Sequence, residues 1–366
     1  MKKILVIGLT ERLGGVETYI YNMCSKLNDF DHKFYFLVHG ANECVYKEEL
    51  EKKFNDNEQH FFFIRKFKSS FFGTIKDLKK FYKEHGNKFD LICLESGSTA
   101  EFMYIYPYCK KLDSKILVHS HAGSGFHKFT NTLFKPILNK YTDIKLSCSN
   151  TATEWLFGKK EIPNTTIINN GIDCEKFTFN ATQREEIRKK YNIKDEDKII
   201  GHIGRFSPEK NHEFMINIIS KIIKKNKNYK LFLVGEGPLK NEIMNRCKDL
   251  NIEENVLFIG NTGETYKYYS AFDIFIMPSI YEGLPIVGIE AQCEGLKCIF
   301  SDNIDKQILI TENAKMLKLD EDNWVDEIIK NDINNKRKSD SEIIKRSGYN
   351  IDNVAQKINS IIKEKI

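Results

Sequence analysis

The sequence predicts an α/β protein with two domains, each built on a doubly wound parallel sheet that helices cover on both faces. A chain of 366 residues is longer than one hydrophobic core usually supports. Apolar runs of four to six residues alternate with longer segments of helical period, which is typical of parallel strands joined by right-handed helical crossovers. This alternation occurs in two series, separated near residue 170 by a turn-forming Asn and Gly segment.

The apolar runs also give the expected positions of the strands. The first series predicts strands at 3–8, 34–38, 61–64, 91–94, 116–119 and 144–148. The second predicts strands at 198–203, 230–234, 256–259, 273–277 and 297–300. We therefore expect domains at 1–168 and 169–345. The last segment, 346–366, has apolar residues at helical spacing and is expected to form a helix that packs back on the first domain.

Composition and charge narrow the classes of protein that this chain can represent. The formal net charge of +5 is too small to favour nucleic acid as a partner. No apolar run approaches the roughly 20 residues that a membrane-spanning helix requires, and the first residues lead into a strand, so we expect a cytoplasmic protein. The nine cysteines include no C-x-x-C pair, which favours reduced thiols and no zinc site.

The most informative motif of the second domain follows the expected strand at 273–277. Glu282 and Glu290 stand eight positions apart around Gly283, Leu284 and Pro285. Pro285 suits the first residue of a helix, whose free amides and positive dipole end would face the crevice at the carboxyl ends of the strands. This arrangement suggests a sugar-nucleotide site in which Glu290 accepts hydrogen bonds from sugar hydroxyls. The alternative is a solvated loop glutamate and a wet helix face.

Two other strand ends of the second domain carry candidate site residues. Gly204 and Arg205 come directly after the strand at 198–203, and Lys210 follows five residues after Arg205. Held on a short loop, both cations could bind one diphosphate, and the alternative is a solvated basic loop. Another strand end places Glu236 between two glycines, before a helix that is expected to start at Pro238. Glu236 is a candidate substrate contact, and the turn itself favours a structural role over a catalytic one.

The first domain offers two loops. Gly14 and Gly15 precede an amphipathic helix, where glycines allow close approach of a phosphate or a sugar, or simply make a tight turn. The G-x-G-x-x-G and P-loop patterns are absent. His119 ends the strand at 116–119 and His121 stands two residues later, and one of them could face a reacting sugar. No third ligand stands at a convincing sequence spacing, so we expect no metal.

The segment 61–73 interleaves aromatic residues with cations. Such a mixture suits the headgroup region of a lipid bilayer and predicts peripheral contact with an anionic membrane. A buried strand followed by a loop is the alternative interpretation.

Taken together, these motifs resemble those of glycosyltransferase family 4, the glycosyl transferases group 1 of bacterial exopolysaccharide and capsule synthesis. The resemblance covers nearly the whole chain. It implies the GT-B architecture, in which two Rossmann-like domains face each other across a cleft. It also implies that Arg205 and Lys210 hold the donor diphosphate and that Glu290 binds the ribose. Glu282 and the amides of Gly283 and Leu284 would hold the donor sugar. The histidine near that sugar would be His119, because it ends the strand, with His121 as the alternative.

The activity that this resemblance implies is retaining, metal-independent transfer without a cofactor. The donor would be a nucleotide sugar, with UDP preferred, that carries a hexose or N-acetylhexosamine. The acceptor would be a saccharide or a polyprenyl-linked saccharide in cell-surface polysaccharide biosynthesis. Two alternatives remain open, namely a nucleotide-sugar epimerase of the same architecture and a catalytically silent partner of another glycosyltransferase.

Overall fold

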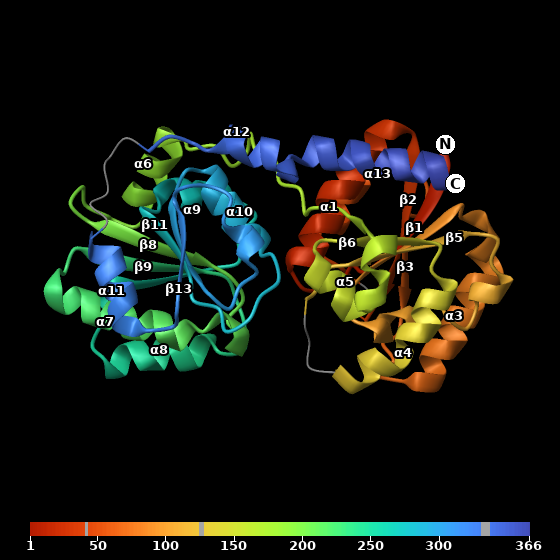
Figure 1. Cartoon of the computed structure of the whole chain (residues 1–366), viewed down its shortest axis with the longest axis horizontal. Helices are drawn as coiled ribbons and strands as arrows, with labels where there is room; N and C mark the ends of the chain where they lie inside the picture. Colours follow the sequence, from red (N-terminus) through yellow and green to blue (C-terminus); the bar gives the residue numbers. More distant parts are fainter. Residues whose placement is uncertain (41–42, 124–127, 331–336) are drawn as a thin grey trace. The chain divides into compact units, whose positions relative to one another are not determined.

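The chain folds into two compact units in the computed structural model, which describes residues 1–40, 43–123, 128–330 and 337–366 (Figure 1). The first unit comprises 1–171 and 351–366, and the second comprises 172–350. The sequence alone places these two boundaries at 168/169 and 345/346. The chain thus leaves the first unit once and returns to it with its last helix.

The first unit is a seven-stranded parallel sheet of order β3-β2-β1-β4-β5-β6-β7. Its strands are β1 (Lys2–Ile7), β2 (His32–His39), β3 (Phe61–Ile64), β4 (Leu91–Ser96), β5 (Lys115–Ser120), β6 (Ile144–Ser147) and β7 (Thr166–Ile167). Its helices are α1 (Gly15–Leu27), α2 (Lys47–Phe54), α3 (Phe71–His85), α4 (Lys128–Tyr141), α5 (Asn150–Leu156) and α13 (Ile351–Lys365). The strand order reverses between the neighbouring strands β1 and β4.

The second unit is a six-stranded parallel sheet of order β10-β9-β8-β11-β12-β13. Its strands are β8 (Lys198–Ile203), β9 (Tyr229–Val234), β10 (Val256–Gly260), β11 (Ile274–Met277), β12 (Lys297–Ser301) and β13 (Ala314–Leu317). Its helices are α6 (Ala181–Lys190), α7 (His212–Lys225), α8 (Lys240–Asp249), α9 (Thr265–Ala271), α10 (Ile286–Cys293), α11 (Glu321–Lys330) and α12 (Ser341–Ile344). Here the order reverses between β8 and β11.

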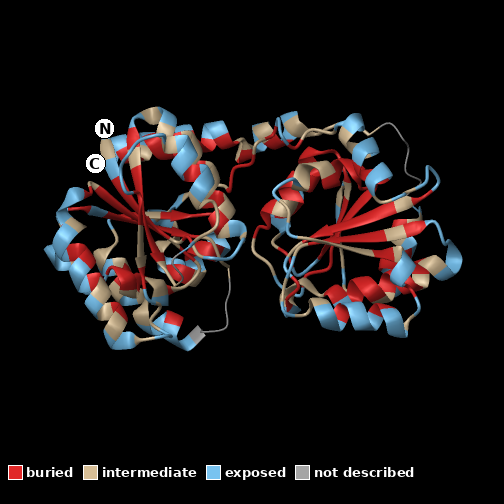
Figure 2. Ribbon diagram, turned by 180° about the vertical axis from the view of Figure 1, so that it is seen from behind, coloured by how far each residue is buried: buried red, intermediate tan, exposed pale blue. Residues whose placement is uncertain are grey.

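Both sheets confirm the expected fold class of two doubly wound parallel sheets. Figure 2 shows buried strands inside each unit and exposed positions on the outer faces of the helices. Central strands are apolar along their whole length because helices cover both faces, and β11 is buried at each of its positions. The apolar runs therefore indicated where each expected strand lies.

The structure differs from the expectation in three details. Strands β7 and β13 were not expected, because two-residue Thr166–Ile167 and the half-exposed Ala314–Leu317 lack a buried apolar run. Helix α10 begins at Ile286, so Pro285 is the residue before the helix rather than its first residue. Helix α8 likewise begins at Lys240 rather than at the proline of its loop.

The last helix confirms the expected packing on the first unit. Ile351, Val354, Ile358 and Ile362 of α13 lie in one apolar cluster with residues of α1 and β1. A hydrogen bond of 2.9 Å joins Asn359 Oδ1 and His32 Nε2 inside this contact. The helical spacing of the apolar residues gives α13 one buried stripe, which explains why it can cover the first sheet although it lies at the end of the chain.

Candidate functional site

The main candidate site of the second unit lies where its sheet reverses strand order. Parallel strands end at the same edge of a sheet, and ligands of open α/β sheets bind at the edge beside the reversal. Arg205 and Lys210 follow β8, and Glu282 follows β11. Since β8 and β11 are paired neighbours, three candidates far apart in sequence are brought to one edge.

Backbone and side-chain hydrogen bonds hold these two loops together. The amide of Ile280 donates to the carbonyl of Glu209 over 2.8 Å, and Asn211 Nδ2 donates to the carbonyl of Pro278 over 3.1 Å. In the same two loops, Lys210 Nζ and Glu282 form a close ion pair. Both side chains are mostly buried, with 15% and 19% of their surfaces exposed. The structure thus brings together two residues that the sequence singled out separately.

Arg205 differs from Lys210 because its side chain is exposed and makes no hydrogen bond or ion pair with the described residues. Its loop can run close to the next one because glycines stand opposite it. A Cβ at Gly235, whose φ is +142°, would lie 2.2 Å from the carbonyl oxygen of Gly204, and one at Gly237 would lie 2.5 Å from that of Phe206. These two glycines are therefore required by packing.

Glu236, between these glycines, is exposed and pairs with Lys240 one helical turn later at 2.6 Å. This ion pair explains the presence of Glu236 without any contact to a ligand. Its place among the substrate contacts remains a prediction.

The loop from Glu282 into α10 buries an apolar side chain and leaves backbone amides without partners in the part of the chain that the structure describes. Leu284 is buried in the core, and the described residues provide no acceptor for the amides of Gly283 and Leu284. Glu290 is also buried, contrary to a wet helix face, with 6% of the residue exposed. It accepts a 2.9 Å hydrogen bond from the Tyr269 hydroxyl. Burial raises the pKa of Glu290 to about 7, and the Tyr269 hydrogen bond opposes that rise only in part.

The first unit has a corresponding reversal between β1 and β4, and a cavity of about 120 Å³ lies there. Its lining includes Thr10, Glu17, Glu95 and Glu101. Burial raises the pKa values of Glu17 and Glu101, and Glu17 accepts a 2.6 Å hydrogen bond from Thr10 Oγ1. The cavity is therefore rich in hydrogen-bond acceptors.

The glycine pair of the first domain lies at the start of α1, which follows this edge of the sheet. Gly14 precedes the helix in an extended conformation, with φ of −155°, that any residue adopts. A Cβ at Gly15 would meet nothing within 4 Å, whereas one at Gly14 would meet the flexible end of Glu17. Packing therefore does not explain Gly15, and a role for it in ligand approach stays a prediction.

The two candidate histidines lie side by side and share one carboxylate. His121 Nε2 makes a 2.6 Å hydrogen bond with Glu95 Oε2, and His119 Nδ1 lies 3.0 Å from the same oxygen. His119 is completely buried, whereas His121 stands one residue beyond the end of β5. Sequence reasoning missed Glu95. The signal was an acidic residue near the end of an apolar strand, and Glu95 is the register partner of His119.

Burial and neighbouring charges set the protonation of Glu95 and His119. Burial alone raises the pKa of Glu95, but the charges and hydrogen bonds of His119 and His121 outweigh burial and lower that pKa to about 2. Burial and the neighbouring His121 lower the pKa of His119 to about 4. At neutral pH Glu95 is therefore ionised and His119 is neutral.

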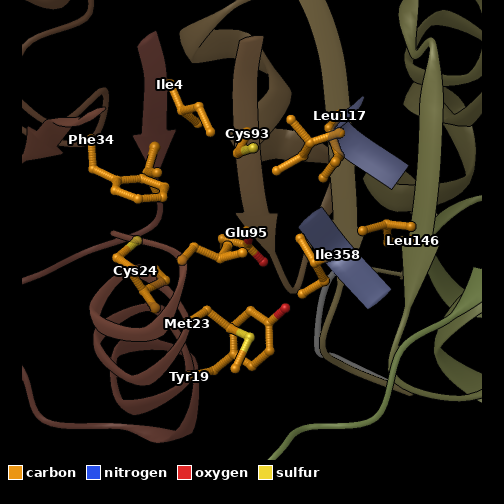
Figure 3. Close-up of a pocket in the computed structure, with 14 residues that line it drawn as sticks. Ile4, Tyr19, Met23, Cys24, Phe34, Cys93, Glu95, Leu117, Leu146 and Ile358 are labelled. Carbon is orange, nitrogen blue, oxygen red and sulfur yellow. The ribbon is translucent and has the colours of Figure 1, made fainter. Parts of the chain in front are cut away.

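Glu95 also reaches a second, apolar cavity of about 30 Å³ under α1 and α13 (Figure 3). Aliphatic and sulfur-containing side chains form most of its lining, including Met23, Cys24, Cys93 and Ile358. Tyr19 closes it and packs its ring on both histidines, with ring centroids 5.0 Å from His119 and 4.7 Å from His121. The carboxylate thus stands between an apolar core and a polar crevice.

Glu95, His119 and His121 each offer a donor atom within 4.8 Å of the others, so this cluster could hold a divalent metal ion. Hydrogen bonding fits better. The 2.6 Å contact is a hydrogen-bond distance, shorter than two ligands on one zinc ion at about 2.0 to 2.2 Å usually approach. Metal-bound imidazoles almost always donate their other N–H, but His119 Nε2 and His121 Nδ1 have no hydrogen-bond partner of good geometry among the described residues.

Comparison with known protein families shows which family this chain belongs to. Residues 13–176 match the family model described as Glycosyltransferase Family 4, and residues 183–330 match that of Glycosyl transferases group 1. The chain belongs to glycosyltransferase family 4. The first match covers Glu95 and both histidines, and the second covers Arg205, Lys210 and Glu290. Each half of this glycosyltransferase is therefore recognised by itself.

Individual relatives agree with this assignment. EpsF of Bacillus subtilis, whose name describes it as a glycosyltransferase, is 28% identical over 84% of this chain and 81% of its own. A UDP-Gal:alpha-D-GlcNAc-diphosphoundecaprenol alpha-1,3-galactosyltransferase of Escherichia coli is 30% identical over 40% of this chain and 39% of its own. Among solved structures, HepE of Anabaena in complex with UDP-glucose is 16% identical, has a TM-score of 0.81 and covers all of both chains. The glycosyltransferase therefore has the GT-B fold.

No helix within the described part of the chain is long and apolar enough to cross a lipid bilayer.

Proposed function

We propose that this glycosyltransferase moves a hexose or N-acetylhexosamine from a UDP-sugar to a saccharide or polyprenyl-linked saccharide in cell-surface polysaccharide biosynthesis, with retention and without a metal ion. The main support for the proposal is the ion pair between Lys210 and Glu282. It lies near Arg205 in sequence, where the strand order of the second sheet reverses between β8 and β11. That edge is where a nucleotide would be expected, and it holds two cations for its phosphates.

The chemistry follows from the charge that develops during transfer. Breaking the bond between the sugar C1 and the phosphate oxygen leaves negative charge on the diphosphate. Lys210 and Arg205 would stabilise that charge, and the unpaired amides before α10 would add oriented dipoles. Glu282 would hold the sugar hydroxyls, and Glu290 the ribose. The acceptor hydroxyl would attack from the face of the leaving phosphate, which takes up its proton, so the configuration is kept.

Relatives support the choice of substrates. The HepE complex contains UDP-glucose, and the name of the Escherichia coli relative gives it a UDP-galactose donor and a diphosphoundecaprenol-linked acceptor. These names favour UDP over GDP and a lipid-linked saccharide as acceptor.

The deciding experiment follows labelled sugar from several UDP-sugars and from GDP-mannose into the lipid fraction of a membrane extract, with and without EDTA. We expect transfer from one UDP-sugar that EDTA leaves unchanged. Conversion of the donor without any acceptor would identify an epimerase instead. No turnover with any donor would favour a silent subunit, and loss of turnover in EDTA would refute metal independence.

We also propose that the protein contacts a membrane through segment 61–73. In the structure, the first part of this segment is a strand and its last part begins helix α3. Phe61–Ile64 forms strand β3, in line with the alternative interpretation. Arg65 pairs with Asp77 at 2.7 Å and Lys66 with Glu11 at 2.7 Å, so each of these cations already has a carboxylate partner. Phe71 and Phe72, however, are 54% and 86% exposed at the start of α3. The exposed face of that helix continues with Lys76, Lys79, Lys80 and Lys83.

We expect the chain to float with vesicles that contain phosphatidylglycerol, and a variant with Phe71→Ser and Phe72→Ser to lose most of that binding. Apolar rings anchor in the interface while each lysine near an anionic surface adds about 1 kcal/mol. Leu309→Ser, which removes another exposed apolar side chain, serves as the control. Equal flotation of all three proteins, or none with wild type, would refute this contact.

A further inference from the structure

We propose that Glu95 is a positioning residue that holds the His121 ring with Nε2 protonated, so that Nδ1 accepts a hydrogen bond from a hydroxyl of the bound sugar substrate. The inference rests on the proposed function and adds to it one residue, one ring atom and one direction of hydrogen bonding.

The direction follows from the partner of Nε2. Glu95 Oε2 lies 2.6 Å from His121 Nε2, and an ionised carboxylate can only accept. Nε2 must therefore carry the proton. In a neutral imidazole the other nitrogen is then an acceptor. The tautomer is thus a consequence of which ring nitrogen faces Glu95.

Neighbouring side chains hold both partners in place. The side chains of Glu95 and His121 are 11% and 3% exposed, so neither can turn freely. The ring of His121 packs against those of Tyr19 and His119, with centroids 4.7 and 4.1 Å away. His119 Nδ1 approaches the same carboxylate oxygen at 3.0 Å. A ring held this firmly keeps one orientation, which is what a substrate contact requires.

The second ring nitrogen is left without a partner. His121 Nδ1 is buried and has no hydrogen-bond partner among the described residues. Leaving a buried polar atom unpaired is unfavourable, because the hydrogen bond it would make with water is lost and not replaced. A substrate hydroxyl would remove this cost on binding, so the unpaired atom makes binding of a donor group more favourable than binding of an apolar one.

The cavity that Glu95 lines, at the reversal between β1 and β4, indicates the chemical class of the ligand. Besides Glu95, its lining includes Glu17, Glu101 and Thr10, and neither Lys nor Arg is among the described residues that line it. Such a surface offers acceptors and repels phosphate or carboxylate groups. A ligand that fits it must bring several donors, which a sugar does through its hydroxyls.

The test is Glu95→Gln, which keeps the shape of the side chain but removes the charge and offers an amide N–H to the ring. In wild type, nitrogen-15 NMR should show His121 protonated at Nε2, and in the variant protonation should shift toward Nδ1. The kcat of transfer should fall at least tenfold, while the Kd for UDP stays within twofold. Glu58→Gln, which alters a paired carboxylate elsewhere in the same unit, should leave kcat unchanged.

A double-mutant cycle separates positioning from a merely structural role. If Glu95 acts through His121, Glu95→Gln should cause no further loss of kcat when His121 is already Ala. An equal loss in both backgrounds, wild-type kcat in Glu95→Gln, or Nδ1 protonation in the wild-type protein would each overturn the inference.

Failure here is distinguishable from failure of the proposed function. If wild type transfers sugar but Glu95→Gln transfers equally well, only the inference is lost. If wild type transfers no sugar, the proposed function fails, while the NMR measurement still decides the tautomer.

Discussion

Replacing Lys210 by Ala is expected to lower kcat about 10²- to 10³-fold, the loss typical when one preorganised electrostatic contact to developing charge is removed. The side chain ends at the edge of the sheet where β8 and β11 meet, paired with Glu282. On binding, a diphosphate would take over part of that pairing. The Kd for UDP should rise as well, because the same cation contacts the ground-state phosphates. Initial rates and calorimetric titration of UDP measure both effects.

Lys315→Ala is the matched control, because Lys315 also pairs with a glutamate, Glu327, at 2.6 Å but lies on the edge strand β13. It should keep wild-type kcat. Circular dichroism should show that both variants are folded. The melting temperature should fall more in Lys210→Ala, because its pair is mostly buried and Glu282 is left unpaired. The more exposed Lys315 pair contributes about 1 kcal/mol or less. Undiminished kcat in Lys210→Ala would contradict the role given to this residue.

Replacing Glu290 by Gln should stabilise the protein at pH 8 while impairing donor binding. The pKa of Glu290 in the folded chain, about 7, lies above the usual glutamate pKa of 4.5. The stability linked to this carboxyl is therefore fully present below pH 4.5 and is lost as pH rises through 7. Gln remains neutral and can still accept from Tyr269. We expect a gain of about 2 to 3 kcal/mol at pH 8 that disappears near pH 4.5.

Urea unfolding of both proteins between pH 4.5 and pH 8 measures this difference. Glu213→Gln, an exposed change in the same unit, should alter the free energy of unfolding by less than about 0.5 kcal/mol at either pH. The KM for donor should rise roughly tenfold in Glu290→Gln, because a hydrogen bond to a charged group is lost. If Glu290→Gln is less stable than wild type at pH 8, or if the difference in the free energy of unfolding does not change with pH, burial does not raise the pKa of Glu290 as described.

Features encoded in one continuous segment could be predicted from the sequence. The expected strands and the final helix followed from apolar runs and their period, because strands buried on both faces tolerate few polar residues. The Gly-Leu-Pro loop beside α10 was predicted from local backbone rules. Strands β7 and β13 were not, because a short or half-exposed edge strand has no such apolar run.

Features that depend on which strands become neighbours could not be predicted in the same way. The pairing of Lys210 with Glu282 requires β8 and β11 to lie side by side, although the residues are 72 positions apart. Glu95 escaped notice because it reaches His121 only across the β4 and β5 pair. Spacing along the chain likewise gave no sign that Glu290 lies buried against Tyr269.

The most direct test of this account is a crystal structure of the protein with UDP. We expect the diphosphate within hydrogen-bonding distance of Lys210 and Arg205 at the carboxyl ends of β8 and β11, and the ribose hydroxyls at Glu290. A nucleotide bound at the other reversal, beside Glu95 and His121, or one that leaves Lys210 paired only with Glu282, would contradict the account.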